Sequence, residues 1–214
     1  MSKKKSIFLY NNLLLTIIIV EYNNLKIAFY ILYMKIAISG KMCSGKSTLA
    51  NMLIEYFQKN NNINFIKYSF ANGVYEIAKN IFYMKNKDRK LLQQIGEKMR
   101  EIDKDIWIKK TINDIHKNND NYVIIDDLRF INELEYIKKH NFFIIRLNIS
   151  KDKQHSHLIT TYPTTYQNHI DNLHNISEID LDNLPHNNFD IIINTDNYTS
   201  LEILNLILEK LKFI

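Results

Sequence analysis

The sequence predicts an α/β fold, with a five-stranded parallel sheet flanked by helices in three layers. Two observations support this prediction. Short apolar runs alternate with amphipathic segments along residues 34–214, and a single helix-like segment joins the first two runs. A strand, a helix and a second strand in this order form a βαβ unit with parallel strands. The 214 residues, 46% of them hydrophobic, suit one globular domain with a full core, or one domain with an appendage.

The first strand is predicted at residues 34–39, and residues 40–48 after it have the sequence Gly-Lys-Met-Cys-Ser-Gly-Lys-Ser-Thr. This stretch matches G-x-x-x-x-G-K-[ST] at every position. It lies between a strand-like and a helix-like segment, which is the context that separates a phosphate-binding loop from a chance match. Gly40 and Gly45 stand where a Cβ would keep the backbone away from phosphate oxygens. We therefore predict a nucleoside triphosphate site and a P-loop NTPase fold.

The residues of this loop have distinct predicted roles. Lys46 should reach the β- and γ-phosphates, the Ser47 hydroxyl should ligate Mg²⁺, and the first amides of the next helix should add the positive end of its dipole. Thr48 is a further donor toward the α-phosphate, and Ser44 completes the contacts to the nucleotide. The other interpretation is a ligand-free turn between a strand and a helix. The only cysteine, Cys43, lies in this loop, which excludes a disulfide framework and a cysteine-rich zinc site.

A helix is predicted at residues 47–60, where apolar residues recur at steps of three and four: Leu49, Met52, Leu53, Tyr56 and Phe57. A second strand is predicted at residues 63–70. Ser69 and Phe70 fall at its carboxyl end, which is where open α/β sheets bind their ligands.

Residues 74–117 have a helical pattern with two breaks. Two of the four arginines, Arg89 and Arg100, lie here near the only tryptophan, Trp107. Arginine offers a planar fork that suits bidentate phosphate contacts, which lysine cannot copy. The alternative, which periodicity alone favours, makes both arginines solvated helix charges and Trp107 a core residue.

Residues 122–130 have the sequence Tyr-Val-Ile-Ile-Asp-Asp-Leu-Arg-Phe. A short run of β-branched residues that ends in acids is typical of a buried central parallel strand, which delivers its carboxylates to the ligand edge of the sheet. One of Asp126 and Asp127 should assist Mg²⁺, directly or through water, and Arg129 should point into the same cleft. The alternative is that these acids pair with Arg129 for structure alone.

The remaining elements are predicted, in order, as a helix, a strand, a polar mobile cover, a last strand and a closing amphipathic helix: residues 132–140, 142–147, 150–175, 190–194 and 201–211. The cover contains Lys151 and Lys153. Its His155 and His157 have no carboxylate or cysteine nearby in the sequence, so they do not indicate a metal site.

The net charge of +5 invites a nucleic-acid hypothesis. Four lysines and one glutamate give residues 1–33 a charge of +3, which leaves +2 for the remaining 181 residues. That charge is too small for the electrostatic footprint of a duplex-binding protein, so we expect no nucleic-acid partner.

Residues 1–33 differ in composition from the rest of the chain. A basic start is followed by an apolar run, residues 7–20, that is interrupted by Asn11 and Asn12. This resembles a signal anchor, but the run is too short and too interrupted for a membrane span. We expect a dispensable extension or a mis-assigned start, with Met34 as the true start, rather than a membrane anchor, and a cytoplasmic protein.

Taken together, the motifs resemble the deoxynucleoside monophosphate kinases of bacteriophages and large DNA viruses. The resemblance spans residues 34–214 and rests on the phosphate loop and five further stretches: residues 69–71, 87–92, 100–107, Asp127-Leu128-Arg129-Phe130-Ile131-Asn132-Glu133 and His174-Asn175-Ile176-Ser177-Glu178. It implies a phosphotransferase that uses ATP and Mg²⁺ to phosphorylate the 5′-phosphate of a deoxynucleoside monophosphate, in the host cytoplasm if the protein is viral.

The resemblance also implies roles for particular residues. Asp127 matches the aspartate of the family and Arg129 its phosphate-binding arginine, so these two and Lys46 are the expected catalytic residues. The helices of residues 72–118 would bind the monophosphate, and residues 150–178 would form the lid. The further substrate contacts implied are Ser69, Phe70, Lys79, Arg89, Arg100, Asp103 and Trp107. The chain departs from the usual pattern because no arginine follows Arg146, so Lys151 and Lys153 are the lid candidates.

Three alternatives remain open. The Asp-x-Arg and Ser-Glu patterns also resemble animal-type phosphomevalonate kinase, although the aromatic residues near the cleft, Phe70, Tyr75 and Trp107, favour a nucleotide base. An arginine-free lid also suits a nucleotide-binding protein without transfer activity, and dephospho-coenzyme A kinase is a weaker alternative. The accepted base and sugar and the formation of a homodimer stay open.

Lys46→Ala should abolish binding of ATP or GTP, because the ammonium is the charge that the loop offers to the β- and γ-phosphates. Equilibrium binding of a fluorescent nucleotide measures this effect. Unchanged binding in the variant would contradict the assignment of the loop.

Overall fold

The computed structural model describes residues 34–211, so the expectations for residues 1–33 concern a segment outside the described residues. The described chain forms one sheet of five strands: β1 Met34–Gly40, β2 Ile66–Tyr68, β3 Tyr122–Leu128, β4 Phe143–Asn148 and β5 Ile191–Asn194. All neighbouring strands are parallel, in the order β2-β3-β1-β4-β5. β1, which leads into the phosphate loop, therefore lies at the centre of the sheet.

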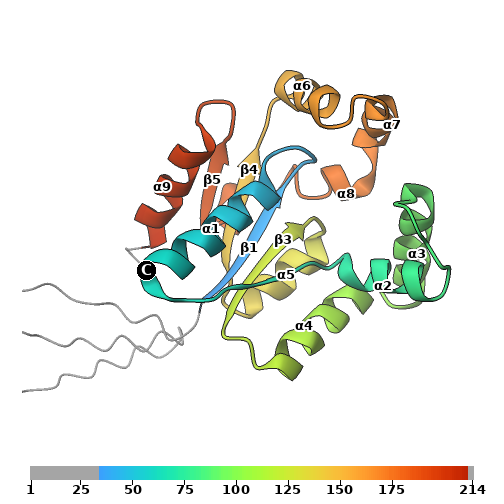
Figure 1. The fold of residues 1–214 in the computed structure, drawn as a ribbon, viewed down its shortest axis with the longest axis horizontal. Helices are drawn as coiled ribbons and strands as arrows, with labels where there is room; N and C mark the ends of the chain where they lie inside the picture. Colours follow the sequence, from blue (N-terminus) through green and yellow to red (C-terminus); the bar gives the residue numbers. More distant parts are fainter. Residues whose placement is uncertain (1–33, 212–214) are drawn as a thin grey trace, which may run out of the picture.

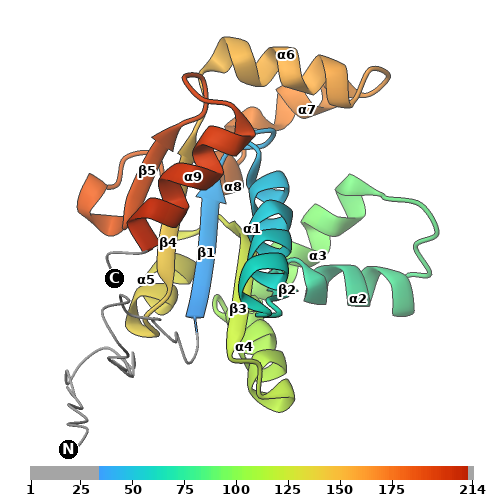
Figure 2. The ribbon, with the colours of Figure 1, turned by 60° about the vertical axis from the view of Figure 1, so that its left-hand side comes forward.

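Helices cover both faces of this sheet (Figures 1 and 2). The α-helices are α1 Lys46–Asn61, α2 Asn72–Asn80, α3 Arg89–Ile102, α4 Ile106–Asn118, α5 Ile131–Lys139, α6 Lys151–Thr161, α7 Tyr166–Asp171, α8 Ile176–Ile179 and α9 Ser200–Leu211. Two short 3₁₀ turns, η1 Asn172–His174 and η2 His186–Asn188, complete the described chain. α1 and α9 pack on one face, and α4 and α5 pack on the other. The predicted three-layer α/β fold is confirmed.

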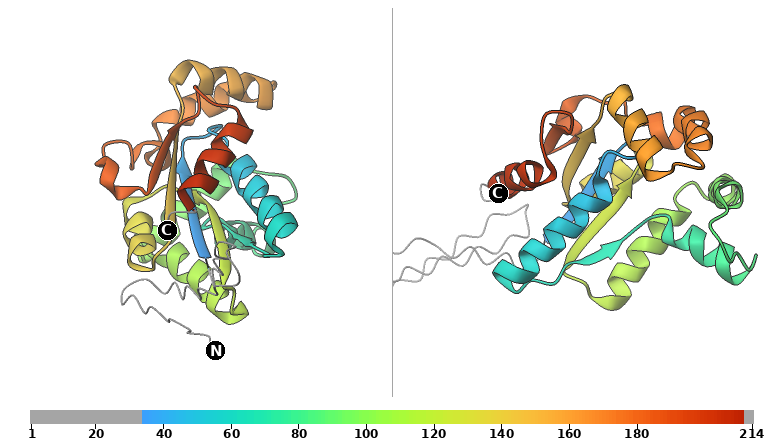
Figure 3. Two further views of the ribbon diagram at one scale, coloured as in Figure 1. Left: turned by 90° about the vertical axis from the view of Figure 1, so that its left-hand side faces the viewer. Right: turned by 45° about the horizontal axis from the view of Figure 1, so that its top comes forward.

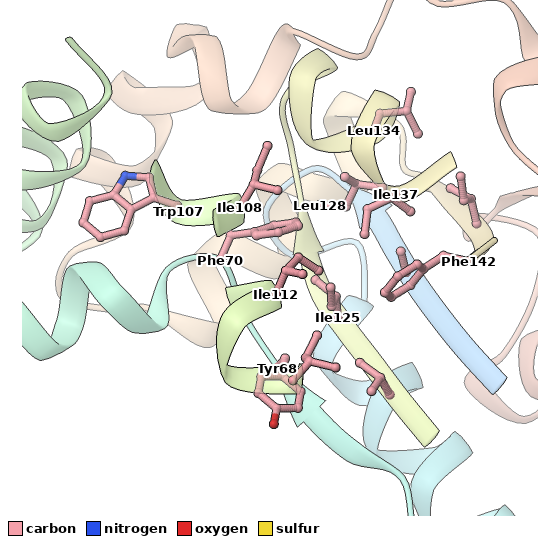
Figure 4. Packing of buried hydrophobic residues seen from close by; sticks show 14 of the residues in the cluster. Tyr68, Phe70, Trp107, Ile108, Ile112, Ile125, Leu128, Leu134, Ile137 and Phe142 are labelled. Carbon is pink, nitrogen blue, oxygen red and sulfur yellow. The ribbon is translucent and has the colours of Figure 1, made fainter. Parts of the chain in front are cut away.

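The central strands β1, β3 and β4 are buried on both faces, as in other parallel sheets. In β1, Ile36 and Ile38 point into the hydrophobic cluster under α1 and α9, whereas Ala37 points into the cluster under α4 and α5. Figure 4 shows the second cluster, where Phe70 lies among aliphatic side chains of β3 and α4 and Trp107 lies at the edge of the cluster. These near-continuous apolar runs explain why the sequence identified the central strands.

Two groups of helices extend beyond this three-layer body. α2 and α3 form an arm on the β2 side of the sheet, and α6, α7 and α8 lie at the carboxyl ends of β1 and β4 (Figures 1 and 3). The two groups meet where the Gln93 amide donates a hydrogen bond to the Asn172 side chain at 3.3 Å. The phosphate loop lies between α1 and the second group (Figure 2).

The elements differ from prediction mainly at their ends. The second strand, predicted at residues 63–70, is only Ile66–Tyr68. It is an edge strand paired with β3 alone, and the Phe65 ring before it packs 5.1 Å from the Phe57 ring on α1. The predicted polar cover is helical, as α6 and α7. Within residues 34–211, no helix is both long and apolar enough to cross a membrane.

Leu53→Ala should destabilise the fold by about 2–5 kcal/mol, because Leu53 of α1 is fully buried and its loss leaves a cavity against the sheet. Urea unfolding followed by circular dichroism measures this change. The matched control is Leu201→Ala in α9, where the side chain is 61% exposed and a loss of about 0.5 kcal/mol or less is expected. Equal effects of the two substitutions would contradict the packing described here.

Candidate functional site

The loop between β1 and α1 folds tightly around Gly40. A Cβ at Gly40 would lie 2.5 Å from Ser44 Oγ and 2.7 Å from the Leu147 carbonyl oxygen, so only glycine fits there. Gly45, the N-cap of α1, has a left-handed backbone with φ +91°, and a Cβ there would meet no atom within 4 Å. Gly40 is therefore required by close packing, and Gly45 by backbone conformation at an open position.

Lys46 places a buried cation inside this loop. Its ammonium donates to the carbonyl oxygens of Gly40 at 2.7 Å and Lys41 at 2.6 Å. Burial, and after it the positive charge of Arg129, lowers the Lys46 pKa to about 7, whereas Glu178 and two aspartates act in the opposite direction. The site therefore holds an ammonium that a nearby anion would stabilise.

The loop residues fit a polyphosphate. Within the described residues, the buried Ser44 hydroxyl has no hydrogen-bond partner, and Ser47 and Thr48 are exposed in the first turn of α1. A helix N-terminus with free amides, an unpaired hydroxyl and a buried ammonium together form an anion site. Lys46 and the loop amides could hold the phosphates, and Ser47 could hold Mg²⁺.

The two acids that end β3 have different environments. Asp127 accepts hydrogen bonds from the Ser69 hydroxyl and from the amides of Phe70 at 2.9 Å and Ala71 at 3.0 Å. Burial raises the Asp127 pKa, and these three donors oppose the rise. Asp126 lies 3.4 Å from the Lys67 ammonium. Asp127 thus holds the turn between β2 and α2 in place.

A bulge redirects these acids. The pairing of β1 with β3 shifts between Ala37 and Ser39, opposite Asp126 and Asp127. An extra residue in one strand turns side chains away from strict alternation, and such irregularities often lie beside functional sites. Both carboxylates therefore remain near the phosphate loop, where both act on the pKa of Lys46.

The magnesium ligands, Ser47, Asp126 and Asp127, stay a prediction. Along residues 34–211, no group of three or more His, Cys, Asp or Glu side chains could hold a metal ion. This does not conflict with Mg²⁺ at a phosphate loop, because that ion is bound through one or two protein oxygens together with phosphates and water.

Arg129 is held by α8. Its guanidinium donates to the Ser177 carbonyl oxygen at 3.2 Å and forms an ion pair with the Glu178 carboxylate. Glu178 also accepts a hydrogen bond from the Met42 backbone N–H in the phosphate loop, at 2.7 Å. The structure therefore brings the predicted arginine to the loop, and it adds a carboxylate between them to which the sequence had given no role.

Arg100 reaches the same edge of the sheet from α3. Its guanidinium lies 4.2 Å from the centre of the Phe130 ring and 4.0 Å from the Glu133 carboxylate. Glu133 also accepts hydrogen bonds from the amides of Arg129 and Phe130. Burial, followed by the charge of Asp127, raises the Glu133 pKa to about 8. Arg100 is therefore positioned by the segment that carries Arg129.

Arg89, at the start of α3, approaches the α6–α7 segment. Its guanidinium lies 5.6 Å from the centre of the Tyr162 ring, and its charge acts on Cys43 in the phosphate loop and on His169. Arg89 therefore places a guanidinium next to the cover, residues 150–175, which contains no arginine.

Two of the predicted substrate contacts, Phe70 and Trp107, are core residues. Phe70 and Trp107 are buried in the core, and the Trp107 indole N–H donates to the Gly96 carbonyl oxygen at 3.2 Å. The structure therefore agrees with the interpretation of Trp107 as a core residue, because its ring packs closely against Gly73.

Four predicted polar contacts also lie away from the loop or have protein partners. The Asp103 carboxylate accepts from the Lys109 ammonium at 2.6 Å. The Lys153 ammonium donates to the Thr195 carbonyl oxygen, also at 2.6 Å, so this lid candidate serves to hold α6 against the end of β5. Lys79 and Lys151 are exposed on α2 and α6.

A second cationic pair, which sequence reasoning missed, lies on the other side of the loop. Arg146 in β4 donates to the Ser39 hydroxyl at 2.9 Å and to Asp182 at 2.8 Å. Asp182 also pairs with Lys41 of the loop at 2.7 Å. Lys41, Arg146 and Asp182 are among the residues that line a pocket of about 200 Å³. A single arginine in an apolar strand was the only signal in the sequence.

No family model and no curated protein sequence matches the chain. Among solved structures, APE1195 is similar over 85% of this chain and 96% of its own, with 15% identity and a TM-score of 0.51. An uncharacterised protein of Eubacterium ventriosum has 16% identity, coverages of 82% and 96%, and a TM-score of 0.49. Shikimate kinase of Aquifex aeolicus has 20% identity, coverages of 84% and 96%, and a TM-score of 0.42.

At these identities the likeness concerns the fold alone, and of these three structures APE1195 has the TM-score above one half. The parallel sheet and the loop that follows its central strand define an α/β protein of the P-loop class. The substrate has to be argued from the site.

ATP affinity should fall as the pH rises between about pH 7.5 and about pH 9, approaching about tenfold per pH unit. Free Lys46, with a pKa of about 7, has lost its proton at these pH values. Phosphates beside it raise that pKa, so binding takes up a proton, and a higher pH opposes binding.

Calorimetric titrations at pH 8 in two buffers of different ionisation enthalpy would measure this proton uptake. Lys46→Arg is the matched control, because a guanidinium stays charged and should remove the pH dependence. Equal heats in both buffers for the unmodified protein would contradict the prediction.

Proposed function

We propose that the protein is an ATP-dependent kinase that transfers a phosphoryl group to the 5′-phosphate of a deoxynucleoside monophosphate. The observation that carries this proposal is the convergence of four cations at one edge of the sheet. Lys46 comes from the loop, Arg129 follows β3, and Arg89 and Arg100 come from opposite ends of α3. The three arginines are held there by the ring contacts and carboxylates described above.

This arrangement suits transfer between two phosphates. Lys46 and the loop amides would bind the donor triphosphate, with Ser47 and Asp126 toward the metal. Bound Mg²⁺ supplies neutralisation of the phosphate charge. Arg129 and Arg100 would bind the acceptor phosphate, which approaches from the α3 side. Phosphoryl transfer depends on positioning and charge neutralisation more than on covalent chemistry.

Asp127 contributes through position in this proposal. Its three hydrogen bonds hold the turn of Ser69 and Phe70, which faces the acceptor side. An acceptor phosphate is already ionised near neutral pH, since its second pKa is about 6. The transfer therefore needs no carboxylate base, in agreement with the donors that occupy Asp127.

A phosphorylated acceptor without a base, such as phosphomevalonate, is the second candidate. The observation that favours it is the burial of Phe70 and Trp107, which removes two of the three aromatic side chains expected to stack on a base. Tyr75 on α2 and Tyr162 after α6 remain partly exposed. The deoxynucleotide stays preferred because these two rings, each near a cation, could still hold a base.

A nucleotide-binding protein without transfer activity is the third candidate. Because the Lys153 ammonium donates to the Thr195 carbonyl oxygen, the cover has one fewer free cation than expected. Arg89 offsets this loss, because it reaches Tyr162 from α3. The transfer proposal is therefore retained, with an arginine supplied by the arm in place of one from the lid.

ADP release with Mg²⁺-ATP, offered each deoxynucleoside monophosphate and separately phosphomevalonate, tests these candidates. We expect turnover with at least one deoxynucleotide and a loss of about 100-fold or more in Arg129→Ala, because the acceptor phosphate loses its arginine. Lys98→Ala, at an exposed pair with Glu101, is the matched control and should keep full activity.

Turnover only with phosphomevalonate would move the protein to the second candidate. ATP binding without turnover on any of these acceptors would contradict the kinase proposal and support the third candidate.

A further inference from the structure

Glu178 connects two parts of the site that lie far apart in the sequence. Its side chain is 3% exposed. Its carboxylate accepts one hydrogen bond from the Met42 N–H at 2.7 Å and another from the Arg129 guanidinium. Met42 belongs to the phosphate loop, and Arg129 is the proposed ligand of the acceptor phosphate. One buried carboxylate therefore touches both the donor side and the acceptor side of the site.

The backbone of Met42 is also held at its carbonyl group. Its carbonyl oxygen accepts from the Gln154 amide at 2.9 Å, and the Cys43 carbonyl oxygen lies 3.1 Å from His157 Nδ1. Gln154 and His157 belong to α6, whereas Glu178 belongs to α8. The segment between β4 and β5 thus fixes the orientation of the loop peptides, on which the direction of their N–H groups depends.

Glu178 is also the negative charge among several cations. Arg129 contacts it directly, and its field favours the charged forms of Lys46 and Arg146. Burial is the main cause of the lowered Lys46 pKa, and repulsion from Arg129 adds to it. Asp126 and Asp127 also act on Lys46, but in the described chain neither contacts the loop backbone or the guanidinium.

We propose that Glu178 is a positioning residue, which holds the Met42 amide and the Arg129 guanidinium in one fixed geometry for transfer. This inference rests on the proposed kinase function. The same carboxylate adds negative charge beside the phosphate loop, so it opposes binding of a polyphosphate. Glu178 therefore lowers the affinity for ATP while it raises turnover, by keeping the acceptor-binding arginine aligned with the loop.

Glu178→Gln in the full chain separates these effects, because the amide oxygen can still accept a hydrogen bond while the charge is removed. We expect kcat to fall by about tenfold or more and the dissociation constant of ATP to fall by about twofold or more. Thermal unfolding should remain near that of the unmodified protein. A role in structure alone would weaken both properties together and could not move them in opposite directions.

Asp180→Asn is the matched control for the docking of α8. Asp180 lies two residues further along and accepts a hydrogen bond from the Ile131 N–H at 2.8 Å, so it anchors the same segment without touching the loop. It should leave kcat and ATP affinity within about twofold of the unmodified protein. If Asp180→Asn reproduces the effect of Glu178→Gln, the positioning role is overturned.

A double-mutant cycle tests whether Glu178 acts through Arg129. In the Arg129→Ala background, Glu178→Gln should cause a smaller further loss of turnover than it causes in the unmodified protein, because one of the two groups that it positions is gone. Independent, multiplying losses would overturn the proposal, as would full turnover in Glu178→Gln alone.

Two possible outcomes require further experiments. If Glu178→Gln does not fold, Glu178→Asp replaces it: the charge stays but is withdrawn by one methylene, so turnover should fall without a gain in ATP affinity, and full turnover would overturn the proposal. If no acceptor is phosphorylated even by the unmodified protein, the kinase function fails on its own. ATP affinity then tests Glu178: tighter binding in Glu178→Gln supports its place beside the phosphates, and unchanged or weaker binding overturns it.

Discussion

The buried ammonium of Lys46 is the constraint on which the rest of the site depends. A buried cation is costly unless hydrogen bonds and opposite charges surround it. Here two loop carbonyls accept hydrogen bonds from it, and the carboxylates of Glu178, Asp127 and Asp126 favour its charged form. The tight turn at Gly40 and the left-handed Gly45 allow the backbone to close around this group. The loop therefore has one geometry, and the neighbouring elements are arranged to maintain it.

The second consequence concerns charge balance at the carboxyl edge of the sheet. Three arginines at this edge have close neighbours: Arg129 pairs with Glu178, Arg100 lies on Phe130, and Arg146 pairs with Asp182. Such neighbours reduce the entropy lost when a phosphate binds, because the guanidinium groups are already oriented. The segment between β4 and β5 provides two of these partners and also holds the loop carbonyls through Gln154 and His157. It thus serves as a support for the loop as well as a cover.

Local patterns predicted most of the fold and part of the site. Short apolar runs located β1 and β3, and apolar residues at steps of three and four located α1 and α9, because these elements are buried on faces that the sequence marks directly. The family resemblance placed Phe70 and Trp107 at a ligand surface, whereas both belong to a buried hydrophobic cluster, in which Trp107 packs against Gly73. Lys153 looked like a free cation, but the end of β5 engages it. The sequence alone does not distinguish an aromatic or charged side chain that contacts a ligand from one that contacts another part of the protein.

The sequence by itself determined the phosphate loop, the parallel sheet and the acids at the end of β3, since each depends on residues adjacent along the chain. Tertiary structure alone decided which distant charges meet there. The bond from Met42 to Glu178 spans 136 residues and that from Ser39 to Arg146 spans 107. No local periodicity encodes such pairs, because they result from the strand order, which brings the loop after β1 beside β4 and α8. The chemistry of the loop can therefore be predicted from its own residues, whereas its electrostatic environment depends on how the whole chain folds.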